Sequence, residues 1–596
     1  MNSWQFFKEA NHRFWHHWGS YISIVFWTTM LIGAVAVPVF TWLTSWILRM
    51  GNIPYVSYTN AIEIITGSPW VALGLLAELL ALVVVIYWQF AFILLSIVNI
   101  RQEKPRTLWA VLRKTILSLQ GTSPVTFLFF LGYFIIIVPF GGLLLSSPLL
   151  NKVKIPDFIW QFLLQNPVAT VAIVTFYVLV GYLGIRLLLT LPLMIIQQVR
   201  TVPAIRLSWR KTHGRVWFYI GNIVLIVGTK ALITMLVYLL AYFSQLYLDT
   251  TKLAFAGAMV NLFLMELISE FMNYYMSTLV FGLMISGAND FRQLRAASLL
   301  QFSRPKVRHW QRWVTGTALV FLTASMVAFN AVVLNGHALS KPMAISHRGV
   351  DNGNGVQNTI PALRKTAKEN PDYVEMDIHE TKDHQFVVMH DENLDDLAGI
   401  DKEPHQLTLK QLTRITVREN GHKAKIASFD QYLKVAHQIH QKLLVEIKVT
   451  PYDTPNMTSL FIQRYQRTLL KHHDRIHTLS YPVVQQLKSQ APDLFVSYIL
   501  PYNLTFPETK ANAYTMEATT LNDSFISNAN QRHQQVYAWT VDDIDQMDQM
   551  MFLGVDGIIT DQLHELQVEI KDNTDHPSYA NLLLALMSEL GADSKN

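Results

Sequence analysis

Ionisable side chains follow or close four short apolar runs in the C-terminal part of the sequence. In chain order they are His347 and Arg348, Glu375 and Asp377, His390 and Asp391, and Glu446 and Lys448. Glu375 and Asp377 are two residues apart, so on a strand their side chains point to the same side. Carboxylates brought together repel one another unless a cation balances them, and oxygen ligands favour Mg²⁺ or Ca²⁺. Zinc is a less favoured alternative, left open by the two histidines.

The two histidines and the two cationic side chains indicate the reaction. Unperturbed imidazole titrates near pH 6.5, so one of His347 and His390 can act as a base while the other acts as an acid. Arg348 and Lys448 supply positive charge that suits an anionic phosphate. A metal site, two imidazoles and two cations together indicate cleavage of a phosphodiester.

A barrel of parallel strands would bring these residues together. Beyond residue 340, apolar runs alternate with segments of helical periodicity, which predicts parallel strands joined by helices. Some 230 residues with about eight such units predict a TIM barrel over 341–570, with its site at the carboxyl ends of the strands. Nine runs compete for eight places, so one lies outside the barrel or is not a strand: 343–346, 373–378, 386–389, 443–447, 476–479, 494–500, 514–518, 536–540 and 556–559.

The first 340 residues have the composition of a helical membrane domain. The 596-residue chain is 51% hydrophobic and 15% charged, whereas soluble domains carry about 25% charged residues. A membrane-spanning helix needs about 20 apolar residues. Seven stretches qualify: roughly 18–48, 70–99, 124–147, 167–197, 217–246, 253–287 and 313–336. The fold class is therefore an α-helical polytopic membrane domain followed by an α/β TIM barrel.

The distribution of positive residues predicts the orientation of these spans. The N-terminus and alternate loops after it hold 18 Lys and Arg residues, against 4 in the other loops, and positive loops stay in the cytoplasm. Seven crossings that start inside end outside, so the barrel is predicted to be extracytoplasmic, attached to the cytoplasmic membrane. The net charge of +5 lies mostly in these flanking loops, so we expect membrane lipids and no nucleic acid as partners.

Some charged residues lie within the predicted spans, where each costs about 2.5–3.5 kcal/mol unless it is paired. Glu266 and Glu270 are four residues apart on one helical face, where Lys230 or Arg186 could meet them. Glu78 is a further charge of this kind. These residues either form structural ion pairs or lie near the membrane interface, or they line a polar cavity that admits lipid headgroups or a substrate.

The motifs of the soluble half resemble the glycerophosphodiester phosphodiesterase family. They are HRG (347–349), QNT (357–359), VEMDIHETKDHQFVVMHD (374–391), EIK (446–448), WT (539–540) and DGIITD (556–561). The resemblance implies hydrolysis of glycerophosphodiesters to glycerol phosphate and an alcohol. For an enzyme outside the cytoplasmic membrane, lipid headgroups and teichoic-acid-like polymers are expected as further substrates. The resemblance implies His347 and His390 as the acid and base, and Glu375, Asp377 and Glu446 as metal ligands. It also implies Arg348 and Lys448 as phosphate contacts, with Trp539 in the glycerol pocket.

One position departs from the family pattern, which has Glu-Asn-Thr where this chain has Gln357-Asn358-Thr359. Glutamine keeps the size but loses the charge, so a contact to Arg348, a histidine or the metal is expected to weaken. We expect tuned activity, with a disabled enzyme as the alternative.

Two further interpretations remain open. The helical half could belong to a lipid-handling or transport protein whose barrel only binds phosphate compounds, although such a binder gains nothing from three carboxylates without a metal. The tail, 571–596, carries an apolar stripe that predicts an amphipathic helix packed on the barrel or touching the membrane.

The absence of cysteine excludes disulfides and thiol catalysis, and no signal indicates an oligomeric state.

Overall fold

The computed structural model divides the chain into two compact units. It describes residues 2–57, 60–101, 107–119, 126, 129–133, 159–160, 163–164, 166–288, 309–336, 341–502, 505–575, 578–584 and 586–587. One unit comprises Met1–Ile53, Thr59–Ala331 and Leu586–Asn596. The other comprises Pro54–Tyr58 and Val332–Ala585.

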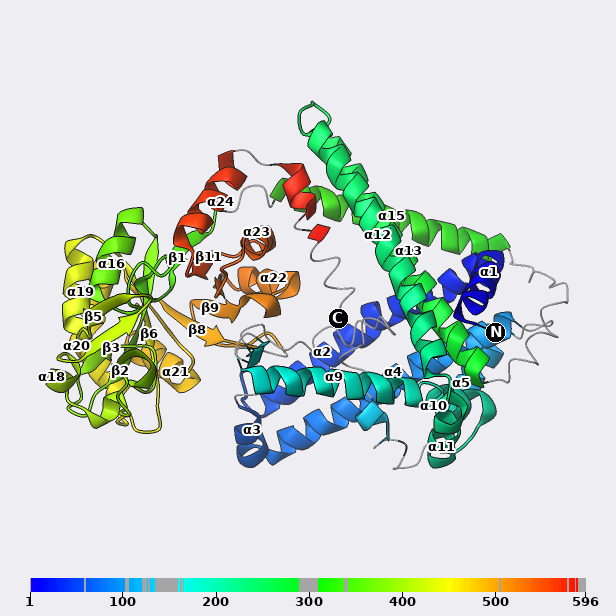
Figure 1. Cartoon of the computed structure of the whole chain (residues 1–596), viewed down its shortest axis with the longest axis horizontal. Helices are drawn as coiled ribbons and strands as arrows, with labels where there is room; N and C mark the ends of the chain where they lie inside the picture. Colours follow the sequence, from blue (N-terminus) through cyan, green and yellow to red (C-terminus); the bar gives the residue numbers. More distant parts are fainter. Residues whose placement is uncertain are drawn as a thin grey trace. The chain divides into compact units, whose positions relative to one another are not determined.

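Long helices build the first unit (Figure 1). Those of the N-terminal half are α1 (Ser3–Leu31), the π-helical turn η1 (Ile32–Ala36), α2 (Val37–Met50), α3 (Ala61–Gly67), α4 (Pro69–Ile100) and α5 (Leu108–Leu119). They are followed by α9 (Pro167–Leu187), α10 (Thr190–Gln197), α11 (Thr201–Thr212), α12 (Val216–Leu248), α13 (Ala254–Ala288) and α15 (His309–Gly336).

Five of the seven predicted spans are helices long and apolar enough to cross a membrane within the described residues. They are Ser3–Met50, Pro69–Ile100, Pro167–Gln197, Val216–Leu248 and Ala254–Ala288. The prediction at 124–147 lies largely outside the described residues. The prediction at 313–336 forms α15, whose apolar part is the shorter Val320–Leu334. The first span is interrupted by η1 just before Pro38, a residue that has no N–H to donate to the helix.

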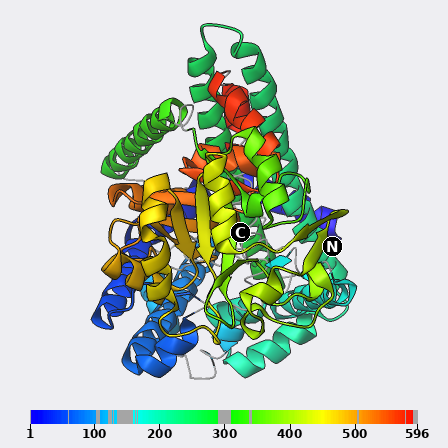
Figure 2. The ribbon, with the colours of Figure 1, turned by 90° about the vertical axis from the view of Figure 1, so that its left-hand side faces the viewer.

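The second unit is the predicted TIM barrel (Figure 2). Eight parallel strands follow one another around it: β1 (Met343–Ser346), β2 (Tyr373–Glu380), β6 (Leu443–Ile447), β7 (Arg475–Thr478), β8 (Val496–Leu500), β9 (Ala513–Glu517), β10 (Gln535–Trp539) and β11 (Gly557–Thr560). The barrel closes because β1 pairs in parallel with both β2 and β11.

Helices connect the strands and cover the outside of the barrel. They are α16 (Ile360–Thr366), α19 (Phe429–Gln438), α20 (Met457–His472), α21 (Tyr481–Gln490), α22 (Asp523–Gln531), α23 (Ile544–Leu553) and α24 (Leu563–Asp575). On β2, the alternate residues Val374, Met376 and Ile378 belong to the buried core that these helices share with the strands. The side chains between them are therefore left to point into the barrel, as the period of two predicts.

The ninth predicted strand runs against the others, so it is the one outside the parallel barrel. This strand, β3 (Phe386–Val388), pairs antiparallel with β2, with Ile378 opposite Val388 and Glu380 opposite Phe386. A short apolar run gives no strand direction, which is why the sequence placed His390 at an ordinary barrel strand end. His390 reaches the site because β3 returns along β2 toward Asp377.

Residues 389–428 form an insertion between β3 and α19. It contains α17 (Asp395–Ala398), η6 (Pro404–Gln406), α18 (Leu409–Leu412) and the two-stranded hairpin of β4 (Thr416–Glu419) and β5 (His422–Lys425). After the barrel, residues 579–584 and 586–587 are helical, as predicted for the tail, and Ala580 and Leu583 are buried.

A short segment between α2 and α3 belongs to the barrel unit. The ring of Tyr55, 7% exposed, packs edge-on against Tyr481 and Tyr498. The backbone N–H of Glu508 donates to the carbonyl of Pro54 at 2.9 Å. The core of the barrel unit is therefore completed by residues that precede the second span.

Tyr55→Ala is expected to remove this packing and to destabilise the barrel unit by about 3 kcal/mol, the usual cost of truncating a buried aromatic ring. Thermal unfolding of the full-length protein in detergent should show a lower melting temperature. Tyr55→Phe keeps the ring and is the matched control. A melting temperature in Tyr55→Ala equal to that of Tyr55→Phe would count against the packing role.

Candidate active site

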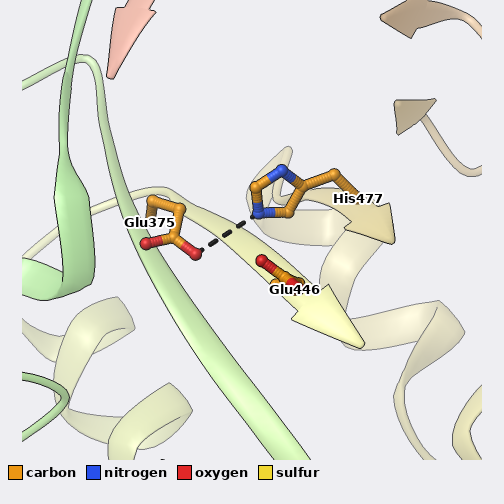
Figure 3. Close-up of side chains that lie close together, drawn as sticks. All are labelled: Glu375, Glu446 and His477. Carbon is orange, nitrogen blue, oxygen red and sulfur yellow. Dashed lines mark hydrogen bonds and ion pairs between the residues drawn. The ribbon is translucent and has the colours of Figure 1, made fainter. Parts of the chain in front are cut away.

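Two buried carboxylates and a buried imidazole converge inside the barrel. Glu375 comes from β2, Glu446 from β6 and His477 from β7 (Figure 3). One ligand atom from each lies within 4.8 Å of the other two, and His477 Nε2 is 3.4 Å from Glu375 Oε1. His477 Nδ1 is buried and has no hydrogen-bond partner among the described residues. This donor set of two carboxylates and an imidazole fits a divalent cation.

Asp377, the third predicted ligand, is held differently. Its Oδ1 lies 3.1 Å from Lys448 Nζ, and its Oδ2 accepts from Asn358 Nδ2 at 2.8 Å. Lys448 Nζ also lies 2.7 Å from Glu446 Oε1. Lys448, predicted as a phosphate contact, thus lies between two of the acidic groups and balances their charge.

The pKa values of this pair indicate that both members are charged at neutral pH. Burial alone would raise the pKa of Asp377, but the charges of Lys448, His390 and Arg348 hold it well below its usual range. Burial alone would lower the pKa of Lys448, but Asp377 and Glu446 raise it above its usual value. The site therefore keeps a cation of its own beside the carboxylates.

Each predicted acid–base histidine is paired with an aspartate. His347 Nδ1 lies 3.0 Å from Asp561 Oδ1, just after β11, and His390 Nδ1 lies 2.8 Å from Asp391 Oδ1. A carboxylate on Nδ1 fixes the tautomer and leaves Nε2 for proton transfer. Burial and Arg348 act to lower the pKa of His347, but Asp561 and Glu375 outweigh them and raise it above its usual value.

The HRG motif forms a tight turn that fixes Arg348. Arg348 adopts a left-handed backbone conformation, with φ +50°, and its N–H donates to Glu375 Oε2 at 2.8 Å. Gly349 follows at φ +67°, and a Cβ there would lie 2.8 Å from the Tyr432 hydroxyl. Only glycine fits that position without displacing the ring.

The QNT loop supports both the turn and the acidic group. The Asn358 N–H donates to the Arg348 carbonyl at 2.8 Å, while the Asn358 side chain binds Asp377. The Arg348 guanidinium donates to Gln357 Oε1 at 2.7 Å. Of the three contacts that the sequence left open for position 357, the one to Arg348 is formed.

Two cavities flank these residues. One, of about 530 Å³, is lined by His390, Asp391, Glu446 and Lys448 among others. The other, of about 500 Å³, is lined by Arg348, Gln357, Glu419 and Asp561 among others. Trp539 lines neither of these two; its Nε1 donates to the Thr515 carbonyl at 3.3 Å, and its role in a glycerol pocket stays a prediction.

The charged residues of the membrane unit have partners near them. Arg186 is buried with its guanidinium 4.4 Å from the centroid of the Trp209 ring. Lys230 is close enough to feel the charge of Glu270, which is one of the pairings that the sequence left open. Glu266 accepts from Asn330 Nδ2 at 2.7 Å, and Glu78 accepts from Thr44 Oγ1 at 2.6 Å. Their possible functional role stays a prediction.

Three residues of the site were missed in the sequence. Asp561 ends the DGIITD motif after an apolar run, so its position at a strand end was a usable signal. His477 carries no such signal in RIHTLS, and it meets the carboxylates because it is level with Glu446 in the β6–β7 register. Glu419 lies on the β4–β5 hairpin, outside every motif quoted above.

Comparisons with known proteins agree with this architecture. A model described as the membrane domain of glycerophosphoryl diester phosphodiesterase matches residues 7–328. Two models of the glycerophosphoryl diester phosphodiesterase family match residues 347–516 and 535–564.

Similar proteins match the barrel half. A glycerophosphodiester phosphodiesterase of Caldanaerobacter subterraneus is 26% identical over 37% of this chain and 94% of its own length. One of Bacillus altitudinis is 25% identical over 36% of this chain and 93% of its own length. The crystal structure of one from Parabacteroides distasonis is 25% identical, with a TM-score of 0.34 over 39% of this chain and 98% of that one.

Asp561→Asn is expected to lower the pKa of His347, because the carboxylate that raises it is lost while burial and Arg348 still act to lower it. The limb of the pH–rate profile that reports His347 should therefore move to lower pH, whether that residue acts as base or as acid. The measurement is the pH dependence of phosphodiester hydrolysis.

Asp545→Asn, at the exposed start of α23, is the control and should leave both limbs in place. A shift to higher pH in Asp561→Asn would contradict the assigned pair.

Proposed function

The chain belongs to the glycerophosphoryl diester phosphodiesterase family, and on that basis we propose that its barrel hydrolyses extracytoplasmic glycerophosphodiesters to glycerol phosphate and an alcohol with a divalent cation. It is a phosphodiesterase with a multi-helix membrane domain. The observation that carries the proposal is the convergence of Glu375, Glu446 and His477 beside Lys448. The two aspartate-paired histidines belong to the same site.

The residues of the site divide into three roles. Glu375, Glu446 and His477 would hold the cation, with Asp377 next to them. A bound cation supplies polarisation of the phosphoryl oxygens and neutralises charge that develops there. Arg348 and Lys448 bind the anionic phosphate. The remainder of the substrate can lie in either of the two cavities.

His347 and His390 move the protons. One imidazole accepts the proton of the glycerol hydroxyl that attacks phosphorus, and the other donates a proton to the departing alcohol oxygen. The family resemblance implies that the first product is a cyclic phosphate. Water then opens it, with the two imidazoles in reversed roles.

The choice of cation follows from the ligand atoms. Carboxylate oxygens favour Mg²⁺ or Ca²⁺, as predicted from the sequence. His477 adds a nitrogen, which Mn²⁺ and Zn²⁺ accept more readily than Ca²⁺ does. All four cations therefore belong in the test.

The proposed side of the membrane rests on the charge distribution and on the make-up of the barrel unit. The distribution of Lys and Arg predicts that the segment between the first two spans lies outside, and its residues 51–68 contain neither. Pro54–Tyr58 of that same loop belong to the barrel unit. A loop and a domain that share one core lie on one side of the membrane, so the barrel follows the loop to the outside.

The substrate class follows from that location. Lysophospholipid or phosphatidylglycerol-type headgroups and glycerophosphate polymers present a phosphodiester at the outer face of the membrane, and soluble glycerophosphodiesters would reach the site from the same side. Such substrates explain why the enzyme is joined to membrane helices.

Purified full-length protein is expected to release glycerol phosphate from glycerophosphocholine with a divalent cation and to lose that activity in EDTA. His347→Ala and His390→Ala should each lower the rate about 10²–10⁴-fold, the usual contribution of a positioned acid or base. His533→Asn, an exposed change near β10, is the control. Turnover that survives both EDTA and His347→Ala would refute the proposed chemistry.

His477→Gln is expected to weaken Mn²⁺ binding at least about tenfold, because one ligand of the cation is lost. Calorimetry measures the affinity, and electron paramagnetic resonance of bound Mn²⁺ should lose its nitrogen coupling. The melting temperature of the apoprotein checks the fold. Unchanged affinity in a folded variant would remove His477 from the ligand set.

A further inference from the structure

We propose that Glu419, on the β4–β5 hairpin, positions the phosphate-binding Arg348 by holding Gln357 between them. The hairpin would thereby supply the negative charge that Gln357 lacks. The inference rests on the proposed function in one respect, because it takes Arg348 as the group that contacts the substrate phosphate.

A continuous chain of hydrogen bonds joins the three side chains. Glu419 Oε2 accepts from the Gln357 backbone N–H at 2.8 Å, and Glu419 Oε1 accepts from Gln357 Nε2 at 2.7 Å. Gln357 Oε1 then accepts from the Arg348 guanidinium at 2.7 Å. One carboxylate thus accepts hydrogen bonds from both the backbone N–H and the side-chain amide of Gln357, which leaves the amide oxygen facing Arg348.

The residue types at the three positions depend on one another. A side chain between a guanidinium and a carboxylate must accept at one end and donate at the other, and the glutamine amide does both. A glutamate at position 357 would pair with Arg348 but would face Glu419 carboxylate to carboxylate. The departure from the Glu-Asn-Thr pattern therefore has a partner on the hairpin, so it need not disable the site.

The hairpin is built firmly enough to act as such a support. Its turn, Asn420-Gly421, has both residues in the left-handed region, with φ +51° and φ +75°, as a tight two-residue hairpin requires. Val417 of β4 is buried in an apolar cluster with Val356, which precedes Gln357, and with Met389, which precedes His390. Glu419 is therefore fixed relative to both sides of the site.

Glu419 also faces the cavity that the arginine faces. Both line the same cavity of about 500 Å³, together with Asp561. A change at Glu419 should consequently affect how Arg348 meets a phosphate group, without altering the predicted metal ligands.

The test is a charge exchange between positions 357 and 419. Glu419 accepts from two Gln357 donors, so in Glu419→Gln the amide nitrogen faces one of these donors and the hold on Gln357 beside Arg348 weakens. Gln357→Glu places two carboxylates together. The double variant Gln357→Glu/Glu419→Gln restores a donor opposite an acceptor at each contact and pairs Arg348 directly with a carboxylate.

Each single variant is expected to lower kcat/KM for glycerophosphocholine about tenfold or more, whereas the double variant should lie within about threefold of the natural protein. Lys423→Gln, an exposed change on β5, is the control for general disturbance of the hairpin. Calorimetry with inorganic phosphate should give the same order of affinities and does not require turnover. Single variants that match the natural protein, or a double variant no better than the poorer single, would overturn the inference.

The two readouts separate this inference from the proposed function. If the natural protein hydrolyses no glycerophosphodiester, the proposed function fails and the order of phosphate affinities alone decides the inference. If a single variant does not fold, recovery of folding and phosphate binding in the double variant supports the pairing. Failure of the double variant to fold refutes it.

Discussion

The burial of like charges on two neighbouring strands is the constraint on which the site depends. Glu375, Asp377 and Glu446 are almost fully buried, and an uncompensated buried charge costs several kcal/mol. The surrounding motifs each supply part of the compensation: the HRG turn gives a backbone N–H, the QNT loop gives an amide and the EIK strand end gives an ammonium. Motifs that are distant in the sequence thus act together to compensate the buried negative charge.

The insertion between β3 and α19 completes the site from the side. One apolar cluster contains residues adjacent to Gln357, residues adjacent to His390 and part of the β4–β5 hairpin. A shift of the hairpin would therefore move the arginine support together with His390, the imidazole proposed for proton transfer. The packing of this cluster therefore fixes the position of one cavity relative to the other, although different charged residues line each of them.

Local periodicity predicted much of the barrel, because a period of two is set by the strand itself. That period correctly placed Val374, Met376 and Ile378 on the core face of β2, and it puts Glu375 and Asp377 on the opposite face. The direction of β3, the place of His477 and the contact of Glu419 with Gln357 depend on pairings between distant segments, which a single sequence does not encode locally.

The segment Pro54–Tyr58 affects the order in which the protein can be made. Tyr55 leaves the ribosome more than four hundred residues before Tyr498, its partner in the barrel core. Contacts so distant in the chain form slowly, so the first extramembrane loop must wait, with its aromatic ring uncovered, until nearly the whole polypeptide is synthesised. Membrane insertion and barrel folding are consequently one assembly process, and a barrel expressed alone would expose an apolar slot beside Tyr481 and Tyr498.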